Sequence, residues 1–286
     1  MRRRVLFAGA VLAAAGLAGC AGAEHDVQAP VVDMTQVKQD LEVLAQARVL
    51  LGHQSVGRDV LAGLRSLVSE NGADVRVIDI DGTPPDDAPG VFSSHIGQNG
   101  DPESKCEMFS QLLTRPERPQ YDLAMMKFCY ADLREGTPLS ADQMVDRYAR
   151  MVDSIRSMRP DVRLLHVTVP LKADPIGKKA WLKRKLGMSV ESDAANVMRN
   201  DFNAKLKERF ANEPLFDLAA VESTYADGGR SSFDRDGRTV YTLARAYTHD
   251  GGHLNPAAQR LAAASFVRTL ADVLATPGAR AASGAR

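Results

Sequence analysis

The chain has 286 residues, of which 44% are hydrophobic and 25% are charged, proportions that are ordinary for a globular protein. Its 36 lysine and arginine residues balance 36 aspartate and glutamate residues, so the formal net charge is zero. Binding to nucleic acid through its phosphates needs a strong positive surface, and the composition does not predict one. The length suits one large domain or, as an alternative, two small ones.

The N-terminal segment has the order of a secretory signal peptide. Residues 1–4 are basic, residues 5–16 form an apolar run, and residues 17–20 read Leu-Ala-Gly-Cys. A basic start, a short apolar middle and small residues at the cut are typical of such signals. The apolar run is shorter than the ~20 residues that a transmembrane helix needs. We therefore expect residues 1–19 to be removed during export.

The four residues that end at Cys20 resemble the bacterial lipobox and match it at every position. The resemblance implies cleavage before Cys20 and a lipid thioether on its sulfur. Such a lipid would anchor the protein to a bacterial membrane, with its folded domain in the periplasm or on the exterior. An ordinary secretory signal with a chance cysteine is the alternative, and Arg3 and Arg4 also allow a twin-arginine route.

The composition divides the exported chain into three parts. Residues 20–32 are small, polar or Pro-containing and predict a tether, residues 33–275 predict the folded domain, and residues 276–286 predict a flexible tail. Once Cys20 carries lipid, Cys106 and Cys129 remain. A pair of cysteines outside the cytoplasm predicts either a disulfide or two separate buried thiols.

Apolar runs of strand length alternate with helical patterns along the domain. Strands are expected at 48–52, 74–80, 122–129, 162–169 and 215–221. Helices are expected at 34–47, 56–69, 141–158 and 195–210, and a last one from Asn255-Pro256. Ser140 and Asn255 are expected as N-caps. Runs this apolar indicate strands buried on both faces. The alternation predicts a flavodoxin-like three-layer α/β/α sandwich with a mostly parallel, five-stranded sheet.

A serine stands where the first strand gives way to a helix. The turn reads Gly52-His53-Gln54-Ser55-Val56-Gly57. Backbone N–H groups at a helix start can stabilise a developing oxyanion, so Ser55 is a candidate nucleophile. The spacing differs from the G-x-S-x-G elbow of α/β-hydrolases. A serine that serves only as the N-cap of the helix is the alternative.

Asp250 and His253 stand just before the last helix and are separated by two glycines. A turn of this kind can bring a carboxylate to the Nδ1 atom of the imidazole. The carboxylate would then orient the ring and stabilise the imidazolium that forms during catalysis. The pattern makes His253 a candidate base and Asp250 its partner.

A serine after the first strand, followed much later by Asp-x-x-His before the last helix, resembles the SGNH, or GDSL-type, hydrolase superfamily. The resemblance covers most of the exported chain in the order and spacing of its elements. It implies a flavodoxin-like fold, ester hydrolysis and a triad in which Ser55, His253 and Asp250 are nucleophile, base and orienting residue. Gly52-His53-Gln54-Ser55 stands where that family usually has Gly-Asp-Ser, which suggests a divergent branch.

The middle motifs of the superfamily are altered here. The family places a glycine N–H and an asparagine side chain around the oxyanion, and Gly97 is the expected glycine, with Gly100 second. The family usually shows Gly-x-Asn-Asp after the third strand, but this chain has residues 128–132, Phe-Cys-Tyr-Ala-Asp. The asparagine is therefore missing there, and Asn99 is a substitute donor. The alternative for this segment is a glycine-rich surface turn.

Other candidates have weaker patterns. His53 and Gln54 flank the serine and either shape the site or make structural hydrogen bonds. No histidine pair has a metal-ligand spacing, so neither a metal nor another cofactor is predicted. The basic segment 178–185 around Trp181 is either a lid over a sugar, a patch for anionic lipid or a solvated helix.

The leading hypothesis is an envelope hydrolase that cleaves acyl or acetyl esters on glycans or lipids through an acyl-enzyme. Transfer of the acyl group to a sugar hydroxyl would use the same triad. A non-catalytic ligand- or glycan-binding lipoprotein on the same scaffold is the second hypothesis, because the middle motifs are altered. A structural protein that docks through the basic segment is the third.

Overall fold

The computed structural model describes residues 30–81, 87–115, 120–175, 182–183, 186 and 191–276. The predicted signal peptide, Cys20, Trp181 and nearly all of the predicted tail lie outside these residues. Among the helices that are described, none is both long enough and apolar enough to cross a membrane.

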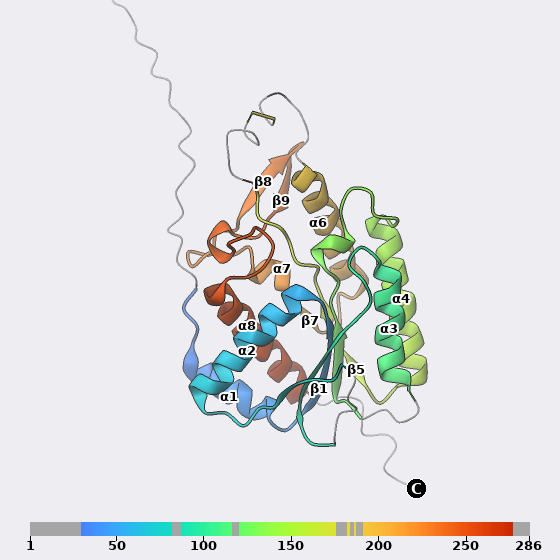
Figure 1. Ribbon diagram of the computed structural model, residues 1–286, viewed down its shortest axis with the longest axis vertical. Coiled ribbons are helices and arrows are strands. Elements are labelled where there is room, and N and C mark those ends of the chain that lie inside the picture. The colour runs from blue at the N-terminus through green and yellow to red at the C-terminus, as the bar shows by residue number, and fades with distance from the viewer. Residues whose placement is uncertain are drawn as a thin grey trace, which may run out of the picture.

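Five parallel strands form the central sheet in the order β2-β3-β1-β4-β5 (Figure 1). They are β1 Arg48–His53, β2 Val77–Asp79, β3 Gly90–His95, β4 Leu123–Met126 and β5 Arg163–Leu164. Helices cover both faces of this sheet. The predicted three-layer α/β architecture with a parallel sheet is therefore confirmed.

The strand segment after α4 changes its partner halfway along. The amide of Leu165 still bonds the carbonyl of Ala124 in β4, at 3.0 Å. From the next residue, β6 (His166–Val167) pairs in parallel with β7 (Leu215–Phe216). The single strand predicted over 162–169 is thus two short strands, β5 and β6, that face different neighbours.

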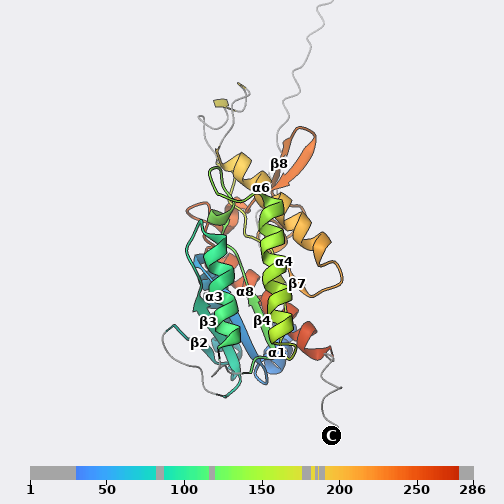
Figure 2. The same cartoon turned by 90° about the vertical axis from the view of Figure 1, so that its right-hand side faces the viewer.

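The helices lie on the two faces of the sheet. On one face are α1 Met34–Leu44, α2 Ser55–Asn71 and α8 Pro256–Ala275, and on the other are α3 Pro102–Thr114, α4 Ala141–Met158 and α6 Glu191–Arg209 (Figures 1 and 2). Along β1, Val49 and Leu51 face the first group, whereas Leu50 faces the second. This alternation divides the core into two layers.

Two of the capping predictions are confirmed. The hydroxyl of Ser140 accepts the amide of Gln143 at the start of α4. The side chain of Asn255 accepts the amide of Ala258 at the start of α8, where Pro256 is the first helical residue. Because these caps satisfy amides that have no partner inside the helix, they fix where each helix begins.

Strand β3 and helix α3 were not predicted, and β3 is the direct neighbour of β1. Its sequence is Gly-Val-Phe-Ser-Ser-His, with too few apolar residues for a recognisable buried run. Its two serines are nevertheless buried, because Ser93 donates to the carbonyl of Ile78 and Ser94 donates to Asp81. Hydrogen bonds of this kind remove the cost of burying a hydroxyl.

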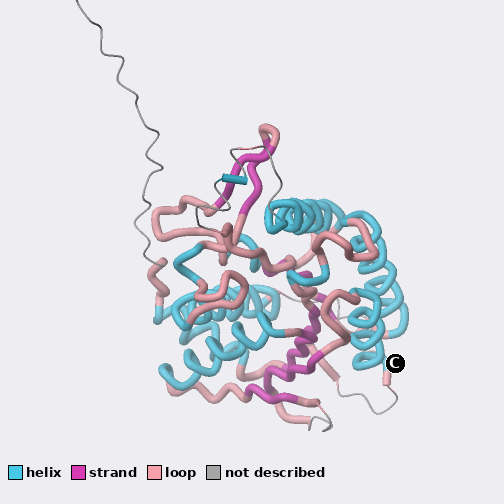
Figure 3. Tube along the Cα trace, turned by 45° about the horizontal axis from the view of Figure 1, so that its top comes forward, coloured by secondary structure: helices cyan, strands magenta, loops and turns pink. Residues whose placement is uncertain are grey.

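The predicted strand over 215–221 is wrong beyond Phe216. Residues Leu218–Val221 form a short helix, α7, because the Asp217 side chain caps it by accepting the amide of Ala220. A hairpin that was not predicted follows, with antiparallel strands β8 Ser232–Arg235 and β9 Arg238–Tyr241. It stands apart from the central sheet (Figure 3).

Cys106 and Cys129 are both buried as free thiols, so the alternative of two separate thiols describes this structure. Burial and, to a smaller extent, the nearby Asp132 raise the pKa of the Cys106 thiol to about 12. A thiol with so high a pKa stays protonated near neutral pH and is a poor nucleophile.

Candidate active site

Ser55 is the first residue of α2, directly beyond the carboxyl end of β1. The N-cap is Gln54, whose backbone is extended and whose side chain makes no capping bond. The alternative in which Ser55 serves as the N-cap is therefore wrong. Ser55 is half-buried, and its hydroxyl forms no hydrogen bond with any residue that the structure describes.

The structure brings Asp250 and His253 into direct contact. Oδ2 of Asp250 lies 2.5 Å from Nδ1 of His253, and Oδ1 accepts the amides of Gly252 and His253, each at 2.8 Å. The imidazole bond is the main reason that the pKa of Asp250 lies well below its usual range. An ionised carboxylate at Nδ1 selects the tautomer with hydrogen on Nδ1, which leaves Nε2 free to accept a proton.

The glycines between these two residues give the turn its shape. Gly251 has a φ of +84°, in the left-handed region that favours glycine. At Gly252 an added Cβ would lie 3.1 Å from the ring and the hydroxyl of Tyr130. Tyr130 also meets the ring of His253 edge-on, with 6.0 Å between ring centroids. The two glycines thus let an aromatic side chain pack against the candidate base.

Asp59 links the helix of Ser55 to the turn of His253. It lies one helical turn after Ser55, and residues four apart share a face of a helix. Its carboxylate accepts the amide of Leu254, the residue after His253, at 3.1 Å. Partial burial raises the pKa of Asp59, and the Leu254 amide and His253 oppose that rise. The segment of Ser55 and the segment of His253 are therefore joined by a hydrogen bond that lies one helical turn from Ser55 and one residue from His253.

Gln54 holds the segment that follows β3. Its side-chain nitrogen donates to the carbonyls of Ile96, at 2.7 Å, and Gly97, at 2.9 Å. Gly97 has a φ of +53°, and an added Cβ would lie 2.5 Å from the backbone nitrogen of Lys105. The amide of Gly97 points at the sulfur of Met108, at 3.0 Å. A thioether is a weak acceptor, so this amide keeps most of its capacity to donate elsewhere.

Asn99 and Gly100 are fixed by a buried ion pair. Lys105 lies 2.5 Å from Asp132, and both side chains are fully buried. The ammonium of Lys105 also donates to the side-chain oxygen of Asn99 at 3.1 Å, while Asp132 accepts the amide of Gly100 at 2.7 Å. The side-chain oxygen of Asn99 already accepts a hydrogen bond from Lys105. The group that Asn99 can offer to a substrate is therefore its NH₂, which donates hydrogen bonds.

Sequence reasoning missed Lys105 and Asp132, although one signal was present. Lys105, Phe109 and Leu113 are spaced by four residues and are all buried on the same face of α3. A lysine on the apolar stripe of a helix needs a buried partner. Asp132, which follows β4, supplies it and also accepts the amide of Cys129 at 2.7 Å.

His53 is a buried residue that packs against the first turn of α2. It is 1% exposed, and a nitrogen of its ring lies 3.0 Å from the carbonyl of Gln54. Burial lowers the pKa of His53 to about 4, so the ring is neutral near pH 7. An added Cβ at Gly57 would lie 2.3 Å from the Cβ of His53. The glycine therefore lets α2 begin directly against this ring.

Three more buried ionisable side chains lie near the same edge of the sheet and were not predicted. Lys127, directly after β4, donates to the carbonyl of Phe128, and burial lowers its pKa. Glu222 accepts the amide of Leu171 with one oxygen, while its other oxygen has no partner among the described residues. Burial raises the pKa of Glu222 to about 8.

The third of these side chains is Arg199. It donates to the carbonyl of Tyr130 at 3.0 Å and to the side chain of Asn196 at 2.7 Å. Burial lowers the pKa of this guanidinium to about 10. Arg199 therefore carries its charge near neutral pH, and it supports the backbone of the tyrosine that packs against His253.

One group of side chains in the described part of the chain has the geometry to hold a metal ion. Ligand atoms of Asp79, Asp81 and His95 lie within 4.8 Å of one another. Nδ1 of His95 is already bonded to Asp81 at 2.7 Å. A metal would have to displace this bond, and the absence of a metal stays a prediction.

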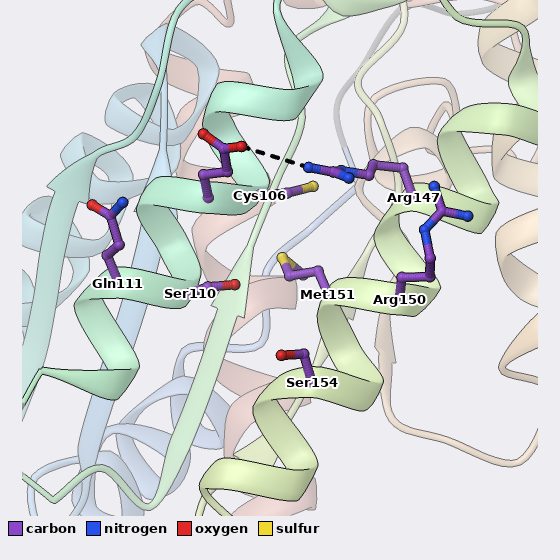
Figure 4. Close-up of a pocket in the computed structure, with 8 residues that line it drawn as sticks. Cys106, Ser110, Gln111, Arg147, Arg150, Met151 and Ser154 are labelled. Carbon is purple, nitrogen blue, oxygen red and sulfur yellow. Dashed lines mark ion pairs between the residues drawn. The ribbon is translucent and has the colours of Figure 1, made fainter.

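A pocket of about 350 Å³ lies between α3 and α4 (Figure 4). Cys106 and Met151 lie at its base, and Glu107 and Arg147 form an ion pair across it, at 3.7 Å. None of the predicted site residues lines this pocket. It is therefore separate from the candidate active site.

No family model matches the sequence, and no curated protein is similar to it in sequence. Solved structures do show similarity. A carbohydrate esterase of family 3 from Talaromyces cellulolyticus is 13% identical, covers 80% of this chain and 98% of its own, and has a TM-score of 0.45. A carbohydrate acetylesterase family member from Sinorhizobium meliloti is 13% identical, with coverages of 79% and 99% and a TM-score of 0.43.

The lipase/acylhydrolase from Enterococcus faecalis is also similar, at 12% identity, with coverages of 79% and 96% and a TM-score of 0.43. These neighbours are esterases and acylhydrolases. At such low identities and TM-scores, their activities remain properties of those proteins.

Proposed function

We propose that the chain is an exported serine hydrolase that cleaves acyl or acetyl esters. Ser55 is the nucleophile, His253 the base and Asp250 the residue that orients the base. The observation that supports this most is the bond between Asp59 and Leu254, because it ties the start of α2 to the turn in which Asp250 holds His253. Nε2 of His253 takes the proton of Ser55 as its oxygen attacks the ester carbonyl.

The oxyanion of the tetrahedral intermediate has three candidate donors. The amide of Ser55 lies at the N-terminus of α2, where amides have no acceptor inside the helix. The amide of Gly97 now donates to the sulfur of Met108, which a charged oxygen would replace. Asn99 offers its side-chain NH₂ because Lys105 holds its oxygen. Collapse of the intermediate expels the alcohol and leaves acyl-Ser55, which water or a sugar hydroxyl then attacks.

Covalent labelling with a fluorophosphonate tests this function, because such probes react only with an activated serine. The wild-type domain from residue 21 is compared with Ser55→Ala, His253→Ala and the control Ser69→Ala, an exposed serine on the same helix. We expect the probe to label the wild type and Ser69→Ala, and to label neither Ser55→Ala nor His253→Ala. Labelling that survives in Ser55→Ala would place the reactive serine elsewhere.

A non-catalytic binding protein on the same scaffold is the second candidate. The observation in its favour is that no hydrogen bond joins Ser55 to His253 in the structure. Catalytic hydrogen bonds often tighten only when substrate binds, so a hydrolase would form the bond between Ser55 and His253 in its substrate complex. A folded wild-type domain that neither reacts with the probe nor hydrolyses acetyl esters would favour the binding protein.

We further propose that Cys20 carries the lipid anchor and that the substrate is an envelope glycan or lipid bearing an ester. The support is the signal-peptide order and the lipobox resemblance of residues 1–20. Metabolic labelling of the full chain with an alkyne fatty acid tests the anchor. Wild type should incorporate the label and partition with membranes, and Cys20→Ala should do neither. Incorporation into Cys20→Ala would contradict the assignment.

A further inference from the structure

A lysine, Lys172, lies next to the turn of the candidate base in the fold. The backbone of Lys172 is held at two points by the buried side chain of Asn196, which accepts its amide at 3.1 Å and donates to its carbonyl at 2.8 Å. The next residue, Ala173, donates its amide to the carbonyl of Gly251 at 3.0 Å. Lys172 is therefore fixed beside the turn that carries Asp250 and His253.

The side chain of Lys172 reaches the aromatic ring that packs against the candidate base. Its ammonium lies 5.2 Å from the centroid of the Tyr130 ring, within the range of a cation–π contact. The same ring packs against Gly252 and meets His253 edge-on. The order Lys172, Tyr130, His253 places a positive charge one aromatic ring away from the imidazole.

A second cation lies on the other glycine of the turn. One nitrogen of Arg245 is 3.7 Å from the point where a Cβ on Gly251 would lie, and another donates to the carbonyl of Asp174 at 2.8 Å. Within the described residues, neither Arg245 nor Lys172 has a carboxylate partner. By contrast, Arg238 and Arg260 are paired with acids.

We propose that the substrate of this site is an ester that also carries a negative charge, which Lys172 and Arg245 bind. This inference rests on the proposed hydrolase function. These two cations lie beside the turn of His253, and a neutral ester would leave both of them without a carboxylate partner among the described residues. A carboxylate or phosphate on the substrate would supply the negative charge that no described residue offers to Lys172 and Arg245.

Matched chromogenic and fluorogenic esters test the inference. One pair places the charge on the acyl side: mono-4-nitrophenyl adipate against 4-nitrophenyl hexanoate. The other pair places it on the alcohol side: 7-acetoxycoumarin-3-carboxylate against 7-acetoxy-4-methylcoumarin. Wild type should prefer one of the charged esters by about tenfold in kcat/KM, the factor that corresponds to one modest charge-assisted contact. The preference should shrink in 0.5 M NaCl because salt screens exposed charges.

Two variants test whether Lys172 and Arg245 cause the preference for charged esters. Lys172→Met should lower the ratio of charged to neutral kcat/KM by about tenfold, and Arg245→Met should lower it in the same direction. Lys38→Met, which removes an exposed lysine on α1, is the control and should keep the wild-type ratio. Thermal melts check that each variant is folded.

The outcomes separate this inference from the proposed function. Hydrolysis that depends on Ser55 but shows no preference for charge would overturn the inference and leave the hydrolase intact. A preference that survives in Lys172→Met and Arg245→Met would also overturn it. No hydrolysis of any ester, together with no fluorophosphonate labelling, would overturn the hydrolase itself and the inference with it.

Discussion

The carboxylate of Asp59 accepts the backbone amide of Leu254 at 3.1 Å, across 195 residues of sequence. Through this bond the first turn of α2, which begins at Ser55, is joined to the turn that presents His253. Neither segment contains the whole site. The placement of Ser55 relative to His253, the proposed nucleophile and base, therefore depends on a third side chain, that of Asp59.

Removal of this link should slow the chemistry without unfolding the domain. Asp59→Ala should lower the rate of fluorophosphonate labelling about tenfold to a hundredfold, because small displacements of reacting groups have effects of this size. Asp59→Asn keeps an oxygen that can accept the Leu254 amide and should recover most of the rate. Asp153→Ala, an exposed acid on α4, is the control. Equal rates in Asp59→Ala and wild type would show that the link has no role.

The carboxylate of Asp250 should be required in its charged form. Asp250→Asn keeps an oxygen for the backbone amides but can present its NH₂ to Nδ1 of His253, which favours the wrong tautomer of the ring. We expect ester hydrolysis to fall roughly 10³–10⁴-fold with little change in thermal stability. His249→Gln changes the exposed neighbour and should be close to wild type. A loss below tenfold in Asp250→Asn would remove Asp250 from the mechanism.

The buried pair of Lys105 and Asp132 should be costly to break. Lys105→Met leaves a buried carboxylate with no cation, so the free energy of unfolding in urea should drop by about 3–5 kcal/mol. The double variant Lys105→Met with Asp132→Asn removes both charges and should recover part of the loss. Arg260→Ala removes a partner of Glu70 in a half-exposed pair and should cost less than ~1 kcal/mol. Equal losses in Lys105→Met and Arg260→Ala would contradict the burial of the charge.

Glu222 should make the protein less stable as the pH rises. Burial raises its pKa from 4.5 to about 8, so between these values the folded chain holds a proton that the unfolded chain has lost. Its contribution is complete below pH 4.5 and is lost as the pH rises through 8, with a slope of up to about 1.4 kcal/mol per pH unit. Glu222→Gln, which can still accept the Leu171 amide, should flatten this slope in urea titrations from pH 5 to 9. Glu208→Gln, an exposed control, should leave it unchanged.

Periodic features of the sequence predicted the fold well. The apolar runs of β1 and β4 and the helical patterns of α4 and α8 are local, and each shows the period of the element that it forms. Strand β3 escaped detection because its buried serines look polar in the sequence and become acceptable only through bonds to Ile78 and Asp81. Helix α7 replaced a predicted strand because the cap at Asp217 outweighed the apolar residues after it.

The sequence by itself determined the three-layer fold, the position of Ser55 at a strand-to-helix turn and the pairing of Asp250 with His253, because each depends on residues close together in the chain. Only the tertiary structure decided how these parts meet. The link from Asp59 to Leu254, the support of Asn99 by Lys105 and Asp132, and the clamp of Asn196 on Lys172 all join distant segments. Their partners are set by how the sheet and helices pack, and no local pattern in the sequence encodes that choice.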